Sequence, residues 1–255
     1  MFEIAHALSS HLSNDVTLFI GLSIIFGLII GSFLNVVIYR MPKILTRQWQ
    51  QNCLALQCKE MPDQAPLTLA TPRSACPTCN HIITAIENIP VISYLFLGGK
   101  CKSCKTRISI RYPLVEILTG ALLGLVAYQF GYTYTTLFAW IFILALITLS
   151  LIDFDTQLLP DDITLPLLWL GLLFNLNNGF TDLKSAVIGA AIGAWFGWQL
   201  LPAVVLLSAV LGAVIGIGLM WLKGKSSQTA IPFGPFLALG GIAALFFGQH
   251  LAGLY

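Results

Sequence analysis

Long uninterrupted runs of apolar residues dominate this chain and predict membrane-spanning helices. The hydrocarbon core of a bilayer is ~30 Å thick and a helix rises ~1.5 Å per residue, so a run of about 18 residues or more suffices to cross it. The fifth run is short, and its boundary with the sixth at Leu200-Leu201-Pro202 is weak. The pattern predicts an all-α polytopic membrane protein with about seven runs, near residues 17–39, 112–130, 134–152, 163–178, 185–199, 200–221 and 229–249.

Composition and charge place these runs in lipid and orient them. The chain is 57% hydrophobic and 9% charged, too few charges to cover a soluble globule, so lipid is its expected surrounding and nucleic acid is not an expected partner. The first run ends in Tyr39-Arg40-Met41-Pro42 without a basic segment before it, unlike a cleavable signal peptide. Ten of the thirteen Lys and Arg residues lie between Arg40 and Arg111, so the positive-inside rule predicts a cytoplasmic loop there. Three parts follow: a first transmembrane helix at 1–39, a cytoplasmic loop at 40–111 and a multi-helix membrane domain at 112–255.

The loop contains all six cysteines, and four of them form two C-x-x-C pairs. Cys76 and Cys79 are followed, after 21 intervening residues, by Cys101 and Cys104, a spacing close to that of zinc ribbons. Four thiolates leave no open position on the metal, so the sequence predicts a structural zinc site in a small zinc-ribbon-like module. Two disulfides are the alternative, which a reducing cytoplasm disfavours. Cys53 and Cys58 are interpreted as ordinary thiols, and His81 as a surface histidine.

A cluster of aspartates ends the third run. Four of the six acidic residues after Tyr112 lie between Asp153 and Asp162, at the expected cytoplasmic surface. Asp161 and Asp162 suit the start of the next helix, whereas Asp153 ends a helix, where a negative charge opposes the helix dipole. An ionisable group at that depth is a functional candidate. Peptide hydrolysis by carboxylates needs two of them close together, one ionised and one protonated, so Asp153 requires a partner.

Several strings resemble the type IV prepilin peptidase family over the chain from about residue 20 to the end. The resemblance implies an aspartic endopeptidase of the bacterial inner membrane that cuts the basic leader from prepilins and pseudopilins on the cytoplasmic face. It also implies methylation of the new amino terminus with S-adenosylmethionine, and it makes Asp153 the first catalytic aspartate. The matching strings are Gly31–Arg40, both cysteine pairs, Glu87–Ser93, Ile108–Glu116, Leu151–Asp153 with Leu159–Asp161, Gly193–Pro202 and Ile231–Phe236.

The second aspartate motif of the family, Gly-x-Gly-Asp-x-Lys, has no counterpart here. Gly179-Phe-Thr-Asp182-Leu-Lys184 is the nearest string, with Thr181 in place of the second glycine, and helix counting puts Asp182 on the opposite membrane face from Asp153. We interpret this as an internal deletion of roughly thirty residues near Ala190–Gly193, which gives seven runs where the family has eight. The deletion would also invert the orientation of later helices, and no Gly-rich signature marks an S-adenosylmethionine site.

Two function classes follow from these observations. The first is a prepilin leader peptidase and N-methyltransferase whose own proteolysis is weakened by the missing aspartate. The alternative is a non-catalytic membrane protein that keeps the zinc module to bind prepilins or secretion-system partners. A transporter fits poorly, because the polar membrane residues gather at one surface instead of crossing at mid-depth.

Overall fold

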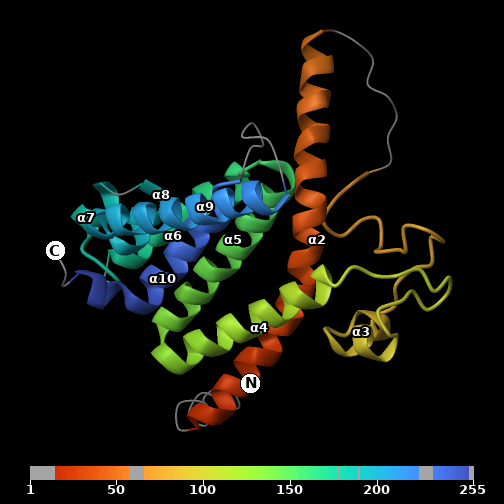
Figure 1. Cartoon of the computed structure of the whole chain (residues 1–255), viewed down its shortest axis with the longest axis horizontal. Helices are drawn as coiled ribbons and strands as arrows, with labels where there is room; N and C mark the ends of the chain where they lie inside the picture. Colours follow the sequence, from red (N-terminus) through yellow and green to blue (C-terminus); the bar gives the residue numbers. More distant parts are fainter. Residues whose placement is uncertain (1–14, 58–65, 177–178, 189, 224–231, 253–255) are drawn as a thin grey trace, which may run out of the picture. The chain divides into compact units, whose positions relative to one another are not determined.

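The computed structural model describes residues 15–57, 66–176, 179–188, 190–223 and 232–252 (Figure 1). These residues form helices and loops, and within them the only β pairing is two isolated bridges, Ala75 with Ile82 and Lys100 with Arg107. The chain divides into two compact units, residues 1–132 and 133–255. The predicted all-α class is confirmed.

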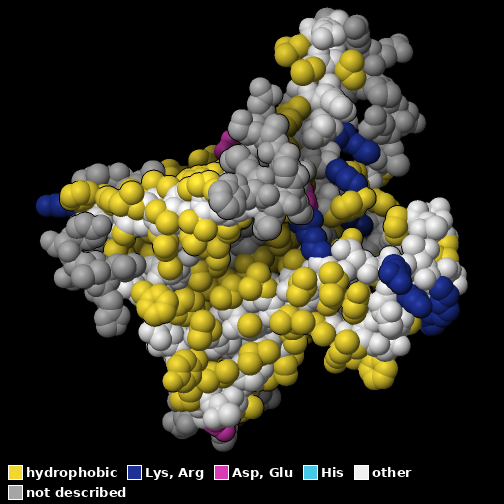
Figure 2. Space-filling view, viewed as in Figure 1, with side chains coloured by type: hydrophobic (Ala, Val, Ile, Leu, Met, Phe, Trp, Pro, Cys, Tyr) yellow, Lys and Arg dark blue, Asp and Glu magenta, His cyan; other side chains and the backbone are white. Residues whose placement is uncertain are grey.

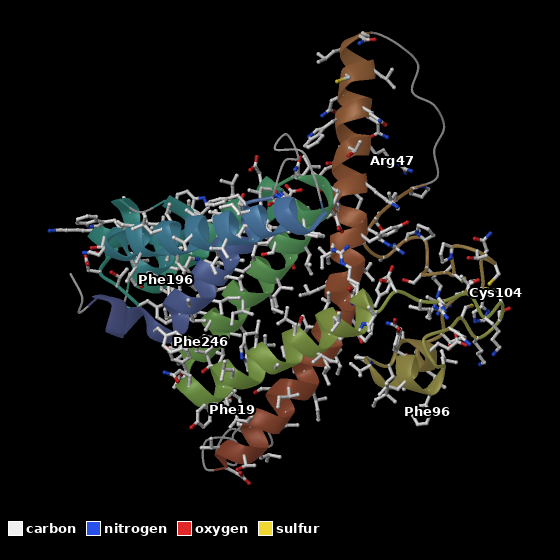
Figure 3. All side chains as sticks on the ribbon, in the orientation of Figure 1. Phe19, Arg47, Phe96, Cys104, Phe196 and Phe246 are labelled. Atoms are coloured by element: carbon white, nitrogen blue, oxygen red, sulfur yellow. The ribbon has the colours of Figure 1, made fainter. Side chains whose placement is uncertain are left out.

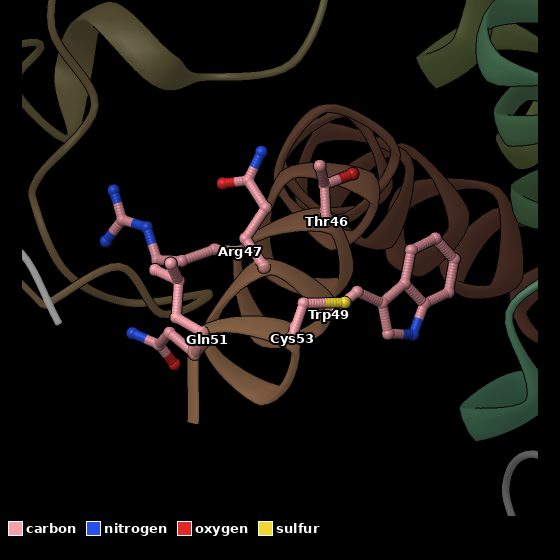
Figure 4. Close-up of a pocket in the computed structure, with 7 residues that line it drawn as sticks. Thr46, Arg47, Trp49, Gln51 and Cys53 are labelled. Atoms are coloured by element: carbon pink, nitrogen blue, oxygen red, sulfur yellow. The ribbon is translucent and has the colours of Figure 1, made fainter. Parts of the chain in front are cut away.

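In the first unit, helix α2 (Val16–Leu56) is one continuous helix of 41 residues. Asp15 caps its start, because Oδ1 accepts a hydrogen bond from the Leu18 backbone N–H at 3.1 Å. The helix continues through Pro42, beyond residue 39 where the predicted apolar run ends. Its length is about 62 Å, twice the ~30 Å hydrocarbon core, so its polar final part must lie outside the lipid. A pocket lies along that final part, and Figure 4 draws the residues of this one helix that line it: Thr46, Arg47, Trp49, Gln50, Gln51, Cys53 and Leu54.

Glycines let α2 pack closely against α4 (Arg111–Phe130). A Cβ atom added at Gly27 would lie 2.7 Å from the Gly120 Cα, and one added at Gly31 would lie 2.8 Å from the Glu116 Cα. Small residues at such crossings allow two membrane helices to approach backbone to backbone. The loop between them carries the short helices η1 (Ile86–Asn88) and α3 (Ile92–Phe96).

The second unit is built around α5 (Tyr134–Thr156), whose side chains Phe142, Ile143 and Ile152 are fully buried. Helix α10 (Gly234–Ala252) packs against α5 and against α9 (Leu201–Lys223). The buried Ser208 hydroxyl of α9 lies 2.9 Å from the carbonyl oxygen of Phe236 in α10, to which it can donate. This contact places the start of α10 next to α9.

The predicted fifth run, 185–199, is not one spanning helix. The structure has α7 (Leu183–Ile188), α8 (Ala190–Phe196) and η2 (Trp198–Leu200) instead. Asn175, the last residue of α6 (Asp161–Asn175), donates hydrogen bonds to the carbonyls of Ala194 at 2.7 Å and Trp195 at 3.0 Å. The Asn175 side chain thus satisfies two of the last carbonyl groups of α8. Gly197, with a φ of +80°, then turns the chain.

Four helices among the described residues are long and apolar enough to cross a membrane: Val16–Leu56, Arg111–Phe130, Tyr134–Thr156 and Trp198–Gly218. The described apolar stretch Gly234–Gly248 is shorter, and α6, at 15 residues, spans about 22 Å. The chain is therefore a multi-pass membrane protein, while the predicted count of seven spanning runs is not confirmed.

Candidate metal centre and carboxylate sites

The two cysteine pairs fold into the same local loop. Cys76 N–H donates to the His81 carbonyl at 2.9 Å, and Cys101 N–H donates to the Thr106 carbonyl at 2.8 Å. In each loop the residue after the second cysteine, Asn80 or Lys105, has a positive φ, 55° and 60°. This left-handed residue turns the chain so that both thiols of a pair face the same side.

The four thiols meet at one point, labelled at Cys104 in Figure 3. All four sulfur atoms lie within 4.8 Å of one another, and Cys76 and Cys101 are buried. The Cys76–Cys104 and Cys79–Cys101 sulfur separations are 3.7 and 3.9 Å. A tetrahedral ion with metal–sulfur bonds of ~2.3 Å holds its sulfurs roughly 3.8 Å apart, whereas a disulfide joins them at ~2.05 Å. These two separations match a tetrahedral metal site, so the four cysteines can hold a metal ion.

Glu87 connects the two cysteine loops. Its carboxylate accepts from the Thr84 N–H at 3.0 Å and lies 3.1 Å from His81 Nε2 and 3.2 Å from Lys102 Nζ. The hydrogen bond from the Thr84 backbone, followed by those from His81 and Lys102, lowers the pKa of Glu87 to about 2. His81, expected to be only a surface histidine, is therefore also a contact between η1 and the first cysteine loop.

Asp153 is buried at the end of α5, with 7% of its surface exposed. Its Oδ2 accepts a hydrogen bond from the backbone N–H of Gly234, the first residue of α10, at 2.8 Å. A Cβ atom at residue 234 would lie 2.7 Å from that oxygen, so the glycine allows this approach. A negative charge on Asp153 is disfavoured by the carboxyl-terminal end of the α5 dipole. The positive amino-terminal end of α10 compensates for this. Asp161 and Asp162 lie in the first turn of α6, as predicted for a helix start.

Asp182 lies elsewhere in the same unit and begins α7. Its Oδ2 accepts from the Ser185 N–H at 3.0 Å and its Oδ1 from the Ser185 hydroxyl at 2.7 Å. These hydrogen bonds from the Ser185 side chain and backbone lower the pKa of Asp182. The segment before it is fixed to the end of α6, because the Phe180 and Thr181 N–H groups donate to Asn175 Oδ1.

The structure does not bring the two predicted aspartates together. Asp153 precedes the start of α6 by eight residues, whereas Asp182 follows its end by seven, and α6 itself is about 22 Å long. Sequence reasoning assigned no role to Gly234 or Asn175. Only the string Ile231–Phe236 pointed to the first, and nothing in the sequence pairs Asn175 with the carbonyls of α8. Cys58 lies outside the described residues.

Comparison with known proteins gives a consistent result over the whole chain. A family model for the bacterial peptidase A24 N-terminal domain matches residues 25–130, and that of the type IV leader peptidase family matches residues 140–194. A protein of Aeromonas hydrophila named prepilin leader peptidase/N-methyltransferase is 43% identical over 100% of this chain and 97% of its own length. The chain belongs to the type IV leader peptidase family. Relatives of the same name from Pseudomonas aeruginosa and Legionella pneumophila are 41% and 40% identical, covering 97% and 91% of this chain and 97% and 92% of their own lengths. No solved structure matches.

The alignment lengths also bear on the predicted deletion. The alignment with the Aeromonas hydrophila protein has 289 positions and this chain has 255 residues, so 34 positions of the alignment (289 less 255) hold no residue of this chain. The family match of the membrane domain ends at residue 194, beside the predicted deletion at 190–193. The number of unmatched positions is thus close to the roughly thirty residues of the predicted deletion.

Proposed function

We propose that this chain is a membrane aspartic endopeptidase and N-methyltransferase that acts on type IV prepilins and pseudopilins, with a cleavage step slowed by the missing segment. The similarity to relatives of that name along the entire chain carries the proposal. Their names are those of enzymes, which favours this function over the non-catalytic alternative. The setting is the bacterial inner membrane, with residues 40–111 on the cytoplasmic side as their basic content predicts.

Asp153 is proposed as one of the two carboxylates that hydrolyse the leader bond. When ionised, it takes a proton from the water whose oxygen bonds to the peptide carbon, while a second, protonated carboxyl donates its proton to the carbonyl oxygen. The C–N bond then breaks as the Asp153 carboxyl passes its proton to the nitrogen, which leaves as the new amino terminus, and the second carboxylate takes its proton back as the carbonyl re-forms. The Gly234 N–H and the amino-terminal end of α10 hold the Asp153 carboxylate in one orientation and support its negative charge. Asp182 is the other predicted carboxylate, and its capping bonds to Ser185 argue against that role.

The cysteine cluster is proposed to bind one Zn²⁺ ion in a structural role. The sulfur separations of 3.7 and 3.9 Å match a tetrahedral thiolate set, and four sulfur ligands complete the coordination of zinc. S-adenosylmethionine is the proposed methyl donor; when bound, it would supply a methyl group to the unprotonated new amino terminus and leave as S-adenosylhomocysteine. The sequence and geometry assign no residues to that cofactor.

The test separates the two reactions. The purified full-length chain in proteoliposomes is given an intact prepilin in one reaction and an already cleaved pilin with S-adenosylmethionine in the other, and mass spectrometry follows the amino terminus. We expect slow cleavage that Asp153→Asn abolishes, and a gain of one methyl group on the cleaved pilin that Asp153→Asn leaves intact. A metal-loaded chain that neither cleaves nor methylates would contradict the proposed function.

A further inference from the structure

Large apolar side chains are exposed on the two short helices of the cysteine-containing loop. We define the α3 patch as Ile86 of η1 with Ile92, Leu95 and Phe96 of α3, which are 77%, 52%, 71% and 88% exposed. Figure 3 shows Phe96 at the edge of α3, pointing away from the cysteine cluster. Apolar side chains gathered in this way mark a surface that contacts protein or membrane.

A hydrogen bond fixes the start of α3 to the membrane helix α4. The Val91 N–H donates to Glu116 Oε2 at 2.7 Å, and Glu116 is 8% exposed. Glu116 lies five residues beyond Arg111, where α4 begins, which is about 7.5 Å along the helix axis. The start of α3 is therefore attached within the first two turns of a helix that is long and apolar enough to cross a membrane.

The charges next to the α3 patch are basic. Lys100, Lys102, Lys105 and Arg107 follow α3 within eleven residues and are all exposed, and Figure 2 shows Lys and Arg side chains beside apolar ones on this part of the surface. The nearby acidic group, Glu87, is already paired with His81 and Lys102. Such a surface suits anionic phospholipid headgroups, which attract Lys and Arg beside a membrane. A basic prepilin leader would be repelled by the same charges.

We propose that the α3 patch inserts into the interfacial region of the bilayer beside α4, while Lys100, Lys105 and Arg107 contact anionic phospholipid headgroups. The Glu116–Val91 hydrogen bond sets the depth of α3, and the exposed apolar side chains then enter the boundary between headgroups and acyl chains. The cysteine cluster is thereby held at the membrane surface. This inference rests on the membrane setting of the proposed function and is independent of peptidase or methyltransferase activity.

Photocrosslinking in lipid tests the proposal with a matched control. Benzoylphenylalanine replaces Phe96 in one full-length variant and Leu56 in the other. Leu56 is the matched control because it is also apolar and 86% exposed, but lies at the end of α2, about 25 Å beyond residue 39 along the helix. Both variants are placed in nanodiscs of phosphatidylethanolamine with phosphatidylglycerol, irradiated, and searched for peptides carrying a phospholipid mass. Metal content reports that each variant folds, and Leu95 carries the probe if the Phe96 variant loses metal.

The expected yield of lipid adducts at residue 96 is about tenfold or more above that at residue 56, as burial of an aromatic side chain in an apolar phase implies. Lys100→Gln should lower the yield at residue 96 up to about fivefold in phosphatidylglycerol nanodiscs and leave it unchanged in phosphatidylcholine. Equal yields at the two probe positions would overturn the proposal. Adducts at residue 96 with residues 133–255 of the chain, or with added prepilin in place of lipid, would overturn it as well and identify a protein partner for the patch.

Discussion

On the proposed deletion near Ala190–Gly193, insertion of the corresponding segment of a relative is expected to give fast leader cleavage. The perturbation replaces Ala190–Gly193 with the corresponding, longer segment of the Pseudomonas aeruginosa relative, whose alignment with this chain has 281 positions. A general acid or base must come within about 3 Å, or one water, of the atom it serves, whereas Asp153 precedes and Asp182 follows α6, a helix about 22 Å long. One positioned acid–base group is worth about 10²- to 10⁴-fold in rate, or roughly 3–5 kcal/mol of barrier.

The assay compares single-turnover cleavage of one prepilin by the chain, the insertion variant and the Pseudomonas aeruginosa relative in the same lipid. We expect the chain to cleave about 10²- to 10⁴-fold more slowly than the relative and the insertion variant to recover most of that difference. The matched control is the same insertion with its aspartate changed to Asn, which restores length without the carboxylate. Cleavage by the original chain at the rate of the relative would refute the reasoning. If Asp182→Asn then abolished that cleavage, Asp182 would be shown to reach the site.

Four further predictions follow from the metal centre, the topology and the packing. Purified chain should contain about one zinc ion per molecule and Cys76→Ser should lose it; zinc far below that level, unchanged by the substitution, would contradict the site. A reporter fused at Gln64 should indicate a cytoplasmic location for the loop; a periplasmic signal would reverse the predicted topology. Asn175→Ala should destabilise the protein by about 2–4 kcal/mol, because two carbonyls and two N–H groups lose their buried partner; an unchanged thermal unfolding midpoint in nanodiscs would argue against this. Glu87→Gln should weaken the pairing of the cysteine loops at neutral pH. The pKa of Glu87 is lowered from 4.5 to about 2, so its contribution is complete above pH 4.5 and is lost as pH falls through 2; loop proteolysis at neutral pH that Glu87→Gln leaves unchanged would disprove it.

The sequence predicted the features that depend on neighbouring residues. The features that depend on contacts between distant residues could not be predicted from it. Each C-x-x-C pair turns within its own loop, so the cysteine cluster was readable from spacing. The continuation of α2 past residue 39 was not predicted, because the apolar run ends there and the helix goes on through Pro42 into a polar stretch. The break between α8 and η2 depends on Asn175, about twenty residues earlier. The hydrogen bond between Asp153 and Gly234 joins residues 81 positions apart, beyond the reach of any periodic pattern.

The sulfur cluster has a thermodynamic consequence beyond ligand geometry. Cys76 and Cys104 are 28 residues apart, and a metal ion between them closes that length of chain as a covalent crosslink would. In the chain-entropy treatment used for disulfides, closing a loop of this length removes about 3.6 kcal/mol of conformational freedom from the unfolded segment. A metal bond differs from a disulfide in that a chelator can remove it without a reductant. Metal bound at the proposed site would therefore act as a reversible crosslink of the loop, and its stabilising effect would follow the free metal concentration.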